Sequence, residues 1–482
     1  MNNHRFSLTP WHPFCGIGFA AFFGLALFCL PPCSLQAQKV GDLVVVTIEY
    51  DTKIKNDVVG KVYAGTVHRM IDQRGNWCAL QDVPGWLPKR FCLSTDAALQ
   101  QYTKRIRGNK QDVEALATRA MILLELGQLQ AAFRDMNESL KVDPQRASLW
   151  NNRGLIYMQL NQIDLAIKDI GYALTLSPQY ANALNNRGMC YYALGNQQKA
   201  IEDYTQAIQL DAGSPTFFVN RGVAYLATGN AEGAIRDFES ARQFRDNIPE
   251  ALIGLSNAHL SLGDLKRAQD YASEAIRIDP QSAEAYNNRG WIWFQTDDHE
   301  KAEQDFVKAI ELNPQFAKAY SNYGVMLTDL KRLPEALENL DRAVSLDEKS
   351  PLPYTNRGNA WLATQAYAKA QVDFDKALEL APENAEAMNS KAWFLATCGG
   401  DEYRDGAAAV QLASQACEAA NMQNWSYLDT LAAAHAETGD FKKAIQLQKQ
   451  ALDRAPSNKR DICKSRLARY ESGQPVRTDP GP

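Results

Sequence analysis

Residues 181–214 read ANALNNRGMCYYALGNQQKAIEDYTQAIQLDAGS, and segments of the same length and pattern lie on both sides of them. Aligned on the break that ends each segment, the chain contains eight consecutive units of 34 residues without a gap. The units are 113–146, 147–180, 181–214, 215–248, 249–282, 283–316, 317–350 and 351–384. A fixed period of this length indicates a repeat architecture, in which each unit buries its apolar face against its neighbours.

Small residues at fixed positions predict that each unit is a pair of antiparallel helices. The twentieth residue is alanine in all eight units, and the eighth is small in every one. The eighth residues are Ala120, Gly154, Gly188, Gly222, Ser256, Gly290, Gly324 and Gly358. Two helices approach closely only where one presents almost no side chain, so these positions mark the crossing. Prolines such as Pro178 and Pro314 stop the second helix, because proline has no N–H to continue it.

These positions, together with the motifs NRG at 152–154 and DYTQAI at 203–208, resemble the tetratricopeptide repeat. The resemblance implies a mainly α fold, an α-solenoid of about ten helical hairpins forming a right-handed superhelix. It also implies that the first helix of each hairpin lines a concave groove, in which a protein or peptide partner binds.

Two less regular units and three flanking segments complete the predicted organisation. A ninth unit, 385–424, keeps the start of the pattern but is longer, and a tenth, 425–458, returns to the period. The last repeat of a solenoid exposes an apolar face, so a closing helix is expected after it. The flanking segments are a capping helix or half repeat at 96–112, a closing helix at 459–471 and a disordered tail at 472–482.

Residues 1–37 have the order of a secretory signal peptide. His4 and Arg5 precede an apolar stretch at 14–30, and a small-residue region then offers a cut after Ala37. We therefore expect an exported protein, periplasmic or extracellular. The alternative is that the apolar stretch is retained as a membrane anchor, with the rest of the chain facing outside the cytoplasm.

Residues 40–93 predict a compact β-barrel of roughly five strands. The strand-like runs, separated by glycine and proline, are 43–47, 58–63, 66–71 and 77–80. The run GDLVVV at 41–46 and the closing GWLP at 85–88 resemble a bacterial SH3-like domain. The resemblance implies a domain that binds peptides or cell-wall material.

The cysteines and histidines predict no metal site, and we expect no cofactor and no enzymatic activity. The six cysteines after the leader form no CxxC pair, and the six histidines are scattered. Export would permit a disulfide between Cys78 and Cys92, although we favour the interpretation that they are small buried hydrophobic residues. No GxSxG, HExxH, Walker or Rossmann motif is present.

The charge balance argues against nucleic acid as a partner. The chain has 51 Lys and Arg against 56 Asp and Glu, for a net charge of −5. No Lys/Arg-rich run is available to neutralise a row of phosphates. A membrane is a partner only if the N-terminal segment is retained as an anchor.

An arginine–aspartate pattern predicts ion pairs between the two helices of a repeat. In six units the seventh residue is arginine and the twenty-third is aspartate, whereas units 249–282 and 317–350 lack both. A hairpin folded near its fifteenth residue places these two positions opposite each other, within reach of a charge-assisted hydrogen bond. The predicted structural pairs are Arg119 with Asp135, Arg153 with Asp169, Arg187 with Asp203, Arg221 with Asp237, Arg289 with Asp305 and Arg357 with Asp373.

A second polar pattern predicts the partner-binding groove. Asparagine recurs at the sixth position, on the helix that the tetratricopeptide resemblance places along the groove. An amide offers donors and an acceptor to a peptide backbone, and aromatic residues at positions nine and twelve would add an apolar floor. The alternative is that the asparagines bond local backbone. The predicted groove residues are Asn152, Asn186, Asn220, Asn288, Asn322, Asn356, Tyr192, Trp291, Phe294 and Trp393.

Two functional hypotheses follow. The leading one is a non-catalytic scaffold that binds an extended peptide or a helix of a partner in the groove, with the SH3-like domain adding a second contact. The alternative is a cell-envelope structural protein, anchored to wall material through the SH3-like domain while the repeats self-associate.

Overall fold

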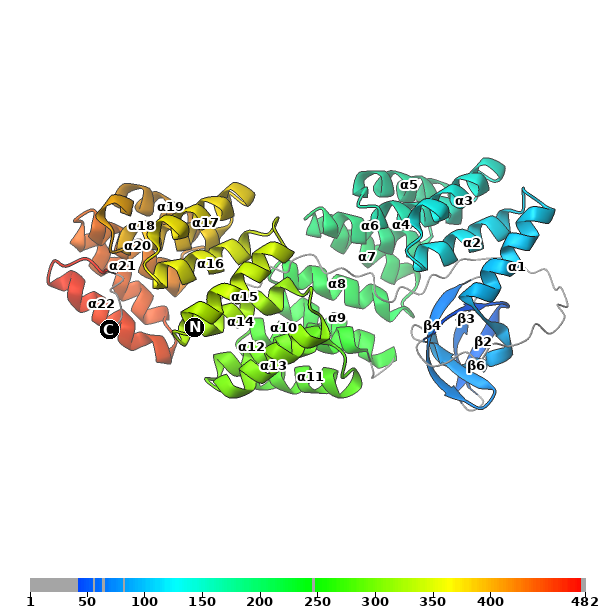
Figure 1. Ribbon diagram of the computed structural model, residues 1–482, viewed down its shortest axis with the longest axis horizontal. Coiled ribbons are helices and arrows are strands. Elements are labelled where there is room, and N and C mark those ends of the chain that lie inside the picture. The colour runs from blue at the N-terminus through cyan, green and yellow to red at the C-terminus, as the bar shows by residue number, and fades with distance from the viewer. Residues whose placement is uncertain (1–41, 55–56, 63–65, 81–82, 245–247, 478–482) are drawn as a thin grey trace. The chain divides into compact units, whose positions relative to one another are not determined.

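The computed structural model describes residues 42–54, 57–62, 66–80, 83–244 and 248–477. Strands form the first part of the described chain and paired helices form the rest (Figure 1). The chain divides within helix α10 (Pro249–Ser261) into two compact units, one ending at Gly254 and the other beginning at Leu255. The predicted leader and the last five residues of the predicted tail lie outside the described residues.

The first unit begins with a seven-stranded antiparallel sheet, so the prediction of roughly five strands was wrong. The strand order is β3-β2-β6-β5-β4-β1-β7. The strands are β1 (Leu43–Val46), β2 (Tyr50–Ile54), β3 (Asp57–Val62), β4 (Val67–Arg74), β5 (Trp77–Leu80), β6 (Val83–Pro88) and β7 (Cys92–Ser94). The sequence patterns missed β2, β6 and β7 because β2 is largely polar, β6 contains Pro84 and Gly85, which read as a turn, and β7 is very short.

Two apolar clusters lie on this sheet. The first is internal to the β domain and contains Cys78 and Cys92, whose Sγ atoms lie 3.6 Å apart and form a hydrogen bond, not a disulfide. The second joins Val45 and Val67 of the sheet to Tyr102 of α1 (Thr95–Gly108). Helix α1 therefore occupies the predicted capping segment and connects the β domain to the helical repeats.

Helical hairpins continue the first unit, and each predicted repeat forms one hairpin. The helices are α2 (Val113–Glu125), α3 (Leu129–Val142), α4 (Ala147–Gln159), α5 (Ile163–Leu176), α6 (Ala181–Ala193), α7 (Gln197–Leu210), α8 (Pro215–Ala227) and α9 (Ala231–Phe244). Even-numbered helices are the first of each pair, and odd-numbered helices are the second. Turns between them use a left-handed residue, for example Gly195 at φ +75°, a conformation that glycine adopts without steric cost.

In six of the eight regular hairpins the close approach of the two helices depends on glycine at the eighth position. A Cβ on Gly188 would lie 2.7 Å from Cε1 of Tyr204, and one on Gly154 would lie 2.5 Å from Cγ1 of Ile170. Real Cβ atoms do not approach other carbons so closely. The large side chain at position twenty-four therefore fills the space that the missing glycine side chain leaves.

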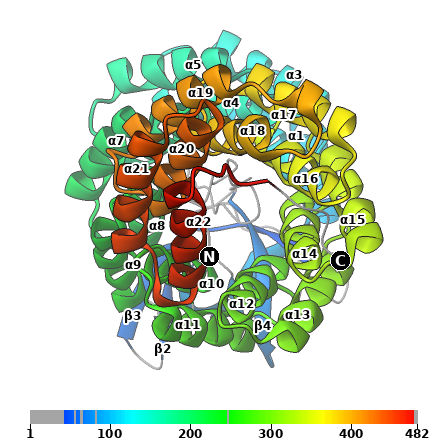
Figure 2. The same ribbon diagram turned by 90° about the vertical axis from the view of Figure 1, so that its left-hand side faces the viewer.

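The second unit continues the same hairpins and ends with the predicted closing helix. The elements are α11 (Leu265–Ile278), α12 (Ala283–Gln295), α13 (His299–Leu312), α14 (Ala317–Asp329), α15 (Leu333–Leu346), α16 (Pro351–Ala363), α17 (Tyr367–Leu380), α18 (Ala385–Thr397), η2 (Asp401–Tyr403), α19 (Gly406–Ala419), α20 (Trp425–Glu437), α21 (Phe441–Arg454), η3 (Ser457–Lys459) and α22 (Arg460–Glu471). Figure 2 shows α14, α16, α18 and α20 on the inner side of this unit, α15, α17, α19 and α21 outside them, and α22 inside α21.

The prediction of a disordered tail was wrong for its first part. Residues 472–477 leave α22 and pack back onto this unit, where Val476 is 8% exposed. The segment is rich in glycine, proline and polar residues, a composition that indicates disorder unless a specific contact orders the chain. In the described part of the chain, no helix is both long enough and apolar enough to cross a membrane.

Two glycine substitutions in neighbouring hairpins should shift stability in opposite directions. Gly188→Ala places a methyl group against the buried ring of Tyr204 and should destabilise the protein by about 1–3 kcal/mol. Gly171→Ala, in the middle of α5, meets no atom within 4 Å and should stabilise it by about 0.5–1 kcal/mol. Midpoints of thermal unfolding followed by circular dichroism measure both shifts. Equal effects of the two substitutions would contradict the close helix crossing.

Candidate protein-interaction surface

Six arginine–aspartate pairs join the two helices of their hairpins, at the positions that the sequence pattern predicts. In each pair Nε and Nη2 of the arginine donate to the two carboxylate oxygens, and the shortest N–O distance is 2.6 or 2.7 Å. The pairs are Arg119–Asp135, Arg153–Asp169, Arg187–Asp203, Arg221–Asp237, Arg289–Asp305 and Arg357–Asp373. All six aspartates are buried, and such bidentate pairs fix geometry as well as charge.

Several of these arginines also contact the preceding repeat, a feature that the sequence analysis missed. Nη1 of Arg153 donates to Oδ1 of Asn137 at 2.8 Å, and Nη1 of Arg221 donates to Oγ1 of Thr205 at 3.0 Å. Arg119 and Arg357 make the equivalent contact. The acceptor is always the twenty-fifth residue of the preceding period. These arginines therefore link their own hairpin to the one before it.

The two hairpins that lack the ion pair have other contacts at the same place. In α10, Oγ of Ser256 donates to the carbonyl of Ala268 at 2.8 Å. In α14, the hydroxyl of Tyr323 donates to Glu303 of the preceding hairpin, which also accepts two hydrogen bonds from Arg332. The first contact joins the two helices of its own hairpin, whereas the second joins α14 to the preceding hairpin.

Breaking one ion pair should cost far more stability than breaking an exposed pair. The carboxylate of Asp203 raises the pKa of Arg187. An arginine stays charged at neutral pH even without such a partner, so removing Asp203 leaves a partly buried cation unpaired. Asp203→Ala should destabilise the protein by about 1–3 kcal/mol. Glu138→Ala removes the exposed pair with Lys141 and should change stability by less than about 0.5 kcal/mol. Chemical denaturation measures both, and similar losses would show that the buried pair is not structural.

The predicted groove asparagines bond one another across repeats. Nδ2 of Asn186 donates to Oδ1 of Asn151 at 2.9 Å, and Nδ2 of Asn322 donates to Oδ1 of Asn287 at 2.9 Å. Asn220, Asn288 and Asn356 donate in the same way to Asn185, Asn257 and Ser321. Asn152, at the start of the row, accepts from Asn151 at 3.2 Å.

This row of asparagines has a structural role that the sequence analysis did not predict. Five of its six members are buried, and Asn288 is only 1% exposed. A partner's backbone would have to break the hydrogen bonds between repeats to reach most of these amides. Their role in partner binding stays a prediction. The asparagine that also occurs at the fifth position of several units was the sequence signal for the inter-repeat bonds.

A pocket of about 440 Å³ lies on the inner side of the second unit and brings four predicted groove residues together. Its walls come from the first helices α12, α14, α16, α18 and α20 and from η3 and α22. The predicted residues that line it are Trp291, Phe294, Asn356 and Trp393. Tyr192 is in the first unit, on α6, and does not belong to this pocket.

Aromatic rings form much of the pocket wall. The rings of Trp291 and Phe294 lie 5.5 Å apart, centroid to centroid, on successive turns of α12. On α18, the ring of Trp393 is covered by Arg466 of α22, whose Cζ lies 4.4 Å from the ring centroid. Such a wall offers apolar contact, and its tryptophans also bind cations over their faces.

Two residues of the pocket wall each carry a buried polar atom that has no hydrogen-bond partner within the described residues. The atoms are Nε1 of Trp425 on α20 and Oδ1 of Asn389 on α18. Trp425 is 7% exposed, so an unsatisfied donor there carries a desolvation cost. Neither residue was among the predicted groove residues, because the prediction used positions six, nine and twelve, whereas Asn389 is the fifth and Trp425 the first residue of its unit.

Two charged residues of the pocket wall, Asp429 on α20 and Arg466 on α22, are paired with each other. Arg466 contacts the buried carboxylate of Asp429, which also accepts from Nε2 of Gln448 at 2.7 Å. Burial raises the pKa of Asp429, while Arg466 and Gln448 act in the opposite direction. Within the described residues, no group of three or more His, Cys, Asp or Glu side chains is placed to hold a metal ion.

Comparison with known families identifies the repeats. Sequence models of the tetratricopeptide repeat match residues 117–181, 181–213, 225–292, 283–316 and 426–455. These matches and the consecutive antiparallel helix pairs show that the chain is a tetratricopeptide-repeat protein. No curated protein matches the sequence.

Solved structures with the same repeat are similar to parts of the chain at low identity. A tetratricopeptide repeat protein from Parabacteroides merdae is 19% identical, over 52% of this chain and 99% of that one, with a TM-score of 0.46. Yeast Tom70 is 15% identical over 80% and 94% of the two chains, with a TM-score of 0.40. YrrB, described as a tetratricopeptide-repeat protein with an unusual peptide-binding site, is 20% identical over 38% and 95%, with a TM-score of 0.32.

Proposed function

We propose that this protein is a non-catalytic interaction module that binds an extended segment of a partner protein on the inner side of its second unit. Proteins built from tetratricopeptide repeats generally bind protein or peptide partners. The observation that supports the location is the pocket lined by Trp291, Phe294 and Trp393, whose wall also includes Asn389 and Trp425, each with a buried unpaired polar atom.

The chemistry of this pocket fits a peptide segment better than a small ion. A peptide unit offers a carbonyl acceptor to Nε1 of Trp425 and an N–H donor to Oδ1 of Asn389. The aromatic wall would take an apolar side chain of the same segment. Because Asp429 and Arg466 already neutralise each other, the pocket does not demand a charged ligand.

The β domain and the leader add two further parts to this proposal. We propose that the β domain is an SH3-like module that makes a second contact with the partner. Because both contacts belong to one chain, the second would form at a high effective concentration and raise the overall affinity. The order of residues 1–37 supports a location outside the cytoplasm, either free or membrane-anchored.

Photo-crosslinking from inside the pocket tests the function directly. The full chain carrying p-benzoylphenylalanine in place of Phe294 should crosslink a discrete partner in the native extracytoplasmic fraction. Trp393→Ala should reduce that product by about tenfold, the effect of losing roughly 1.4 kcal/mol of aromatic contact. The product is then identified by mass spectrometry.

Two matched controls accompany this measurement. Trp361→Ala removes a tryptophan of α16 that stacks on Lys369 and does not line the pocket, so crosslinking should persist. The same photoreactive residue at Val372, which is 66% exposed on α17, should not capture the partner. Capture that is equally strong from Val372, or insensitive to Trp393→Ala, would contradict binding in the pocket.

A further inference from the structure

Residues 472–477, which we name the strap, leave the closing helix in a direction fixed by one glycine. Gly473 has φ +73°, and its N–H donates to the carbonyl of Tyr470 at 3.0 Å. The next N–H, of Gln474, donates to the carbonyl of Arg469 at 2.9 Å. These two bonds form a Schellman motif, which ends the helix and turns the chain.

The strap places one aliphatic side chain in an apolar site between inner helices. Val476 belongs to a cluster that includes Ala392 of α18 and Leu431 of α20. The carbonyl of Pro475 accepts a hydrogen bond from Nη2 of Arg469 at 3.2 Å, which holds the strap in an extended path. Gln474 remains exposed. Val476 is therefore the single deep contact of the strap.

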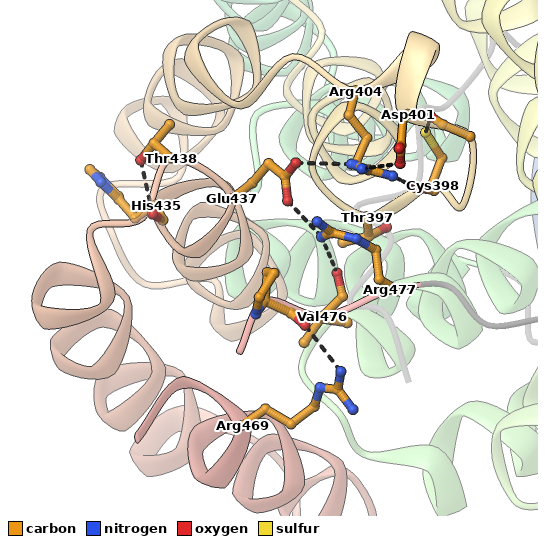
Figure 3. Close-up of polar contacts among 12 residues, drawn as sticks. Thr397, Cys398, Asp401, Arg404, His435, Glu437, Thr438, Arg469, Val476 and Arg477 are labelled. Atoms are coloured by element: carbon orange, nitrogen blue, oxygen red, sulfur yellow. Dashed lines mark hydrogen bonds and ion pairs between the residues drawn. The ribbon is translucent and has the colours of Figure 1, made fainter. Parts of the chain in front are cut away.

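The residue after it meets an acidic group that the scaffold holds in place. Nη1 of Arg477 lies 2.5 Å from Oε2 of Glu437, an ion pair rather than an aligned hydrogen bond (Figure 3). The other oxygen of Glu437, Oε1, accepts from Nε of Arg404 at 2.9 Å. Arg404 in turn donates to the carbonyl of Cys398 at 3.0 Å.

Glu437 would therefore keep its position if the strap were absent. Arg404 follows directly on η2, the short helix that occurs only in the lengthened ninth hairpin of the described repeats. The side chain of Glu437 is 13% exposed, so loss of Arg477 would leave one buried carboxylate oxygen without a cation. The site thus has a fixed apolar pocket followed directly by a fixed acidic group.

We propose that the strap occupies a docking site for a partner segment in which an aliphatic residue is followed directly by arginine, and that it keeps this site closed until the partner displaces it. The inference rests on the proposed function, because it assumes that the inner side of the second unit takes extended segments. It adds the sequence preference of the partner and a form of regulation.

The weakness of the strap's attachment makes exchange feasible. The strap buries one valine side chain and makes one ion pair, in which the arginine side chain is 28% exposed. These contacts must offset the conformational entropy that is lost when six residues become ordered. The apolar face of the last hairpin is covered by α22 whether or not the strap is bound. The strap nevertheless competes with a partner segment for the site, and its effective concentration is high because it is part of the same chain. A segment of another molecule therefore binds weakly while the strap is intact.

Peptide binding to the full chain tests the inference. The probe is a fluorescein-labelled, amidated peptide SGQPVR, the sequence of residues 472–477. Val476→Ser with Arg477→Ser releases the strap and should raise the affinity for this peptide by about tenfold or more over wild type, because the tethered competitor is lost. Adding Glu437→Gln should reverse the gain. Fluorescence anisotropy measures all three proteins.

Controls separate a specific site from general effects. Val372→Ser with Lys464→Ser removes one exposed aliphatic and one exposed cationic side chain elsewhere and should behave as wild type. The peptide SGQPSS should not bind the released chain. Circular dichroism checks that every variant is folded.

Three outcomes would overturn the inference. They are equal affinity of the wild-type and released chains, no binding to a folded released chain, and a doubled mass in solution showing that the strap of a second copy is the occupant. Crosslinking from position 294 depends on Trp393 and not on the strap peptide. If one of these outcomes were found and the Trp393-dependent crosslink from position 294 were still formed, the strap inference would fail and the proposed function would stand.

Discussion

The helical part of this protein depends on one steric constraint, the close crossing of the two helices in each hairpin. A glycine at the eighth position faces a large side chain at the twenty-fourth, as in Gly222 with Phe238 and Gly358 with Phe374. A Cβ at either glycine would lie under 3 Å from the facing ring. The distance between the helices is therefore set by the absence of a side chain, and it puts the neighbouring arginine within bidentate reach of its aspartate.

That constraint also determines which groups the inner side can offer to a partner. The residue before each arginine is usually asparagine, and fixed hairpin spacing brings its amide to the neighbouring repeat, as from Asn186 to Asn151. Most of the amide donors are thus used to align successive hairpins. The groups that remain for the recognition we propose are the aromatic rings one or two turns further along, such as Phe294 and Trp393.

The sequence predicted those features that repeat with the chain's period. The helix pairs and the ion pairs such as Arg289–Asp305 follow from spacing within one unit and recur in its copies, and the closing helix follows from the apolar face that the last copy leaves exposed. Features that occur once could not be read in this way. Strand β6 was missed because pairing with β5 overrides its Pro84 and Gly85, and the strap was missed because a single buried valine, Val476, orders a segment whose composition indicates disorder.

The departure of the ninth hairpin from the period shows why the irregular part of a repeat protein holds its specific sites. A regular hairpin presents the same groups as its neighbours, so a ligand has no unique register along them. The extra residues around η2 place Arg404 against Glu437, which no other described hairpin reproduces, and the strap binds at that point. Contacts that recur in every period thus stabilise all the hairpins, whereas the insertion near η2 places a charged group, Glu437 with Arg404, at one position only.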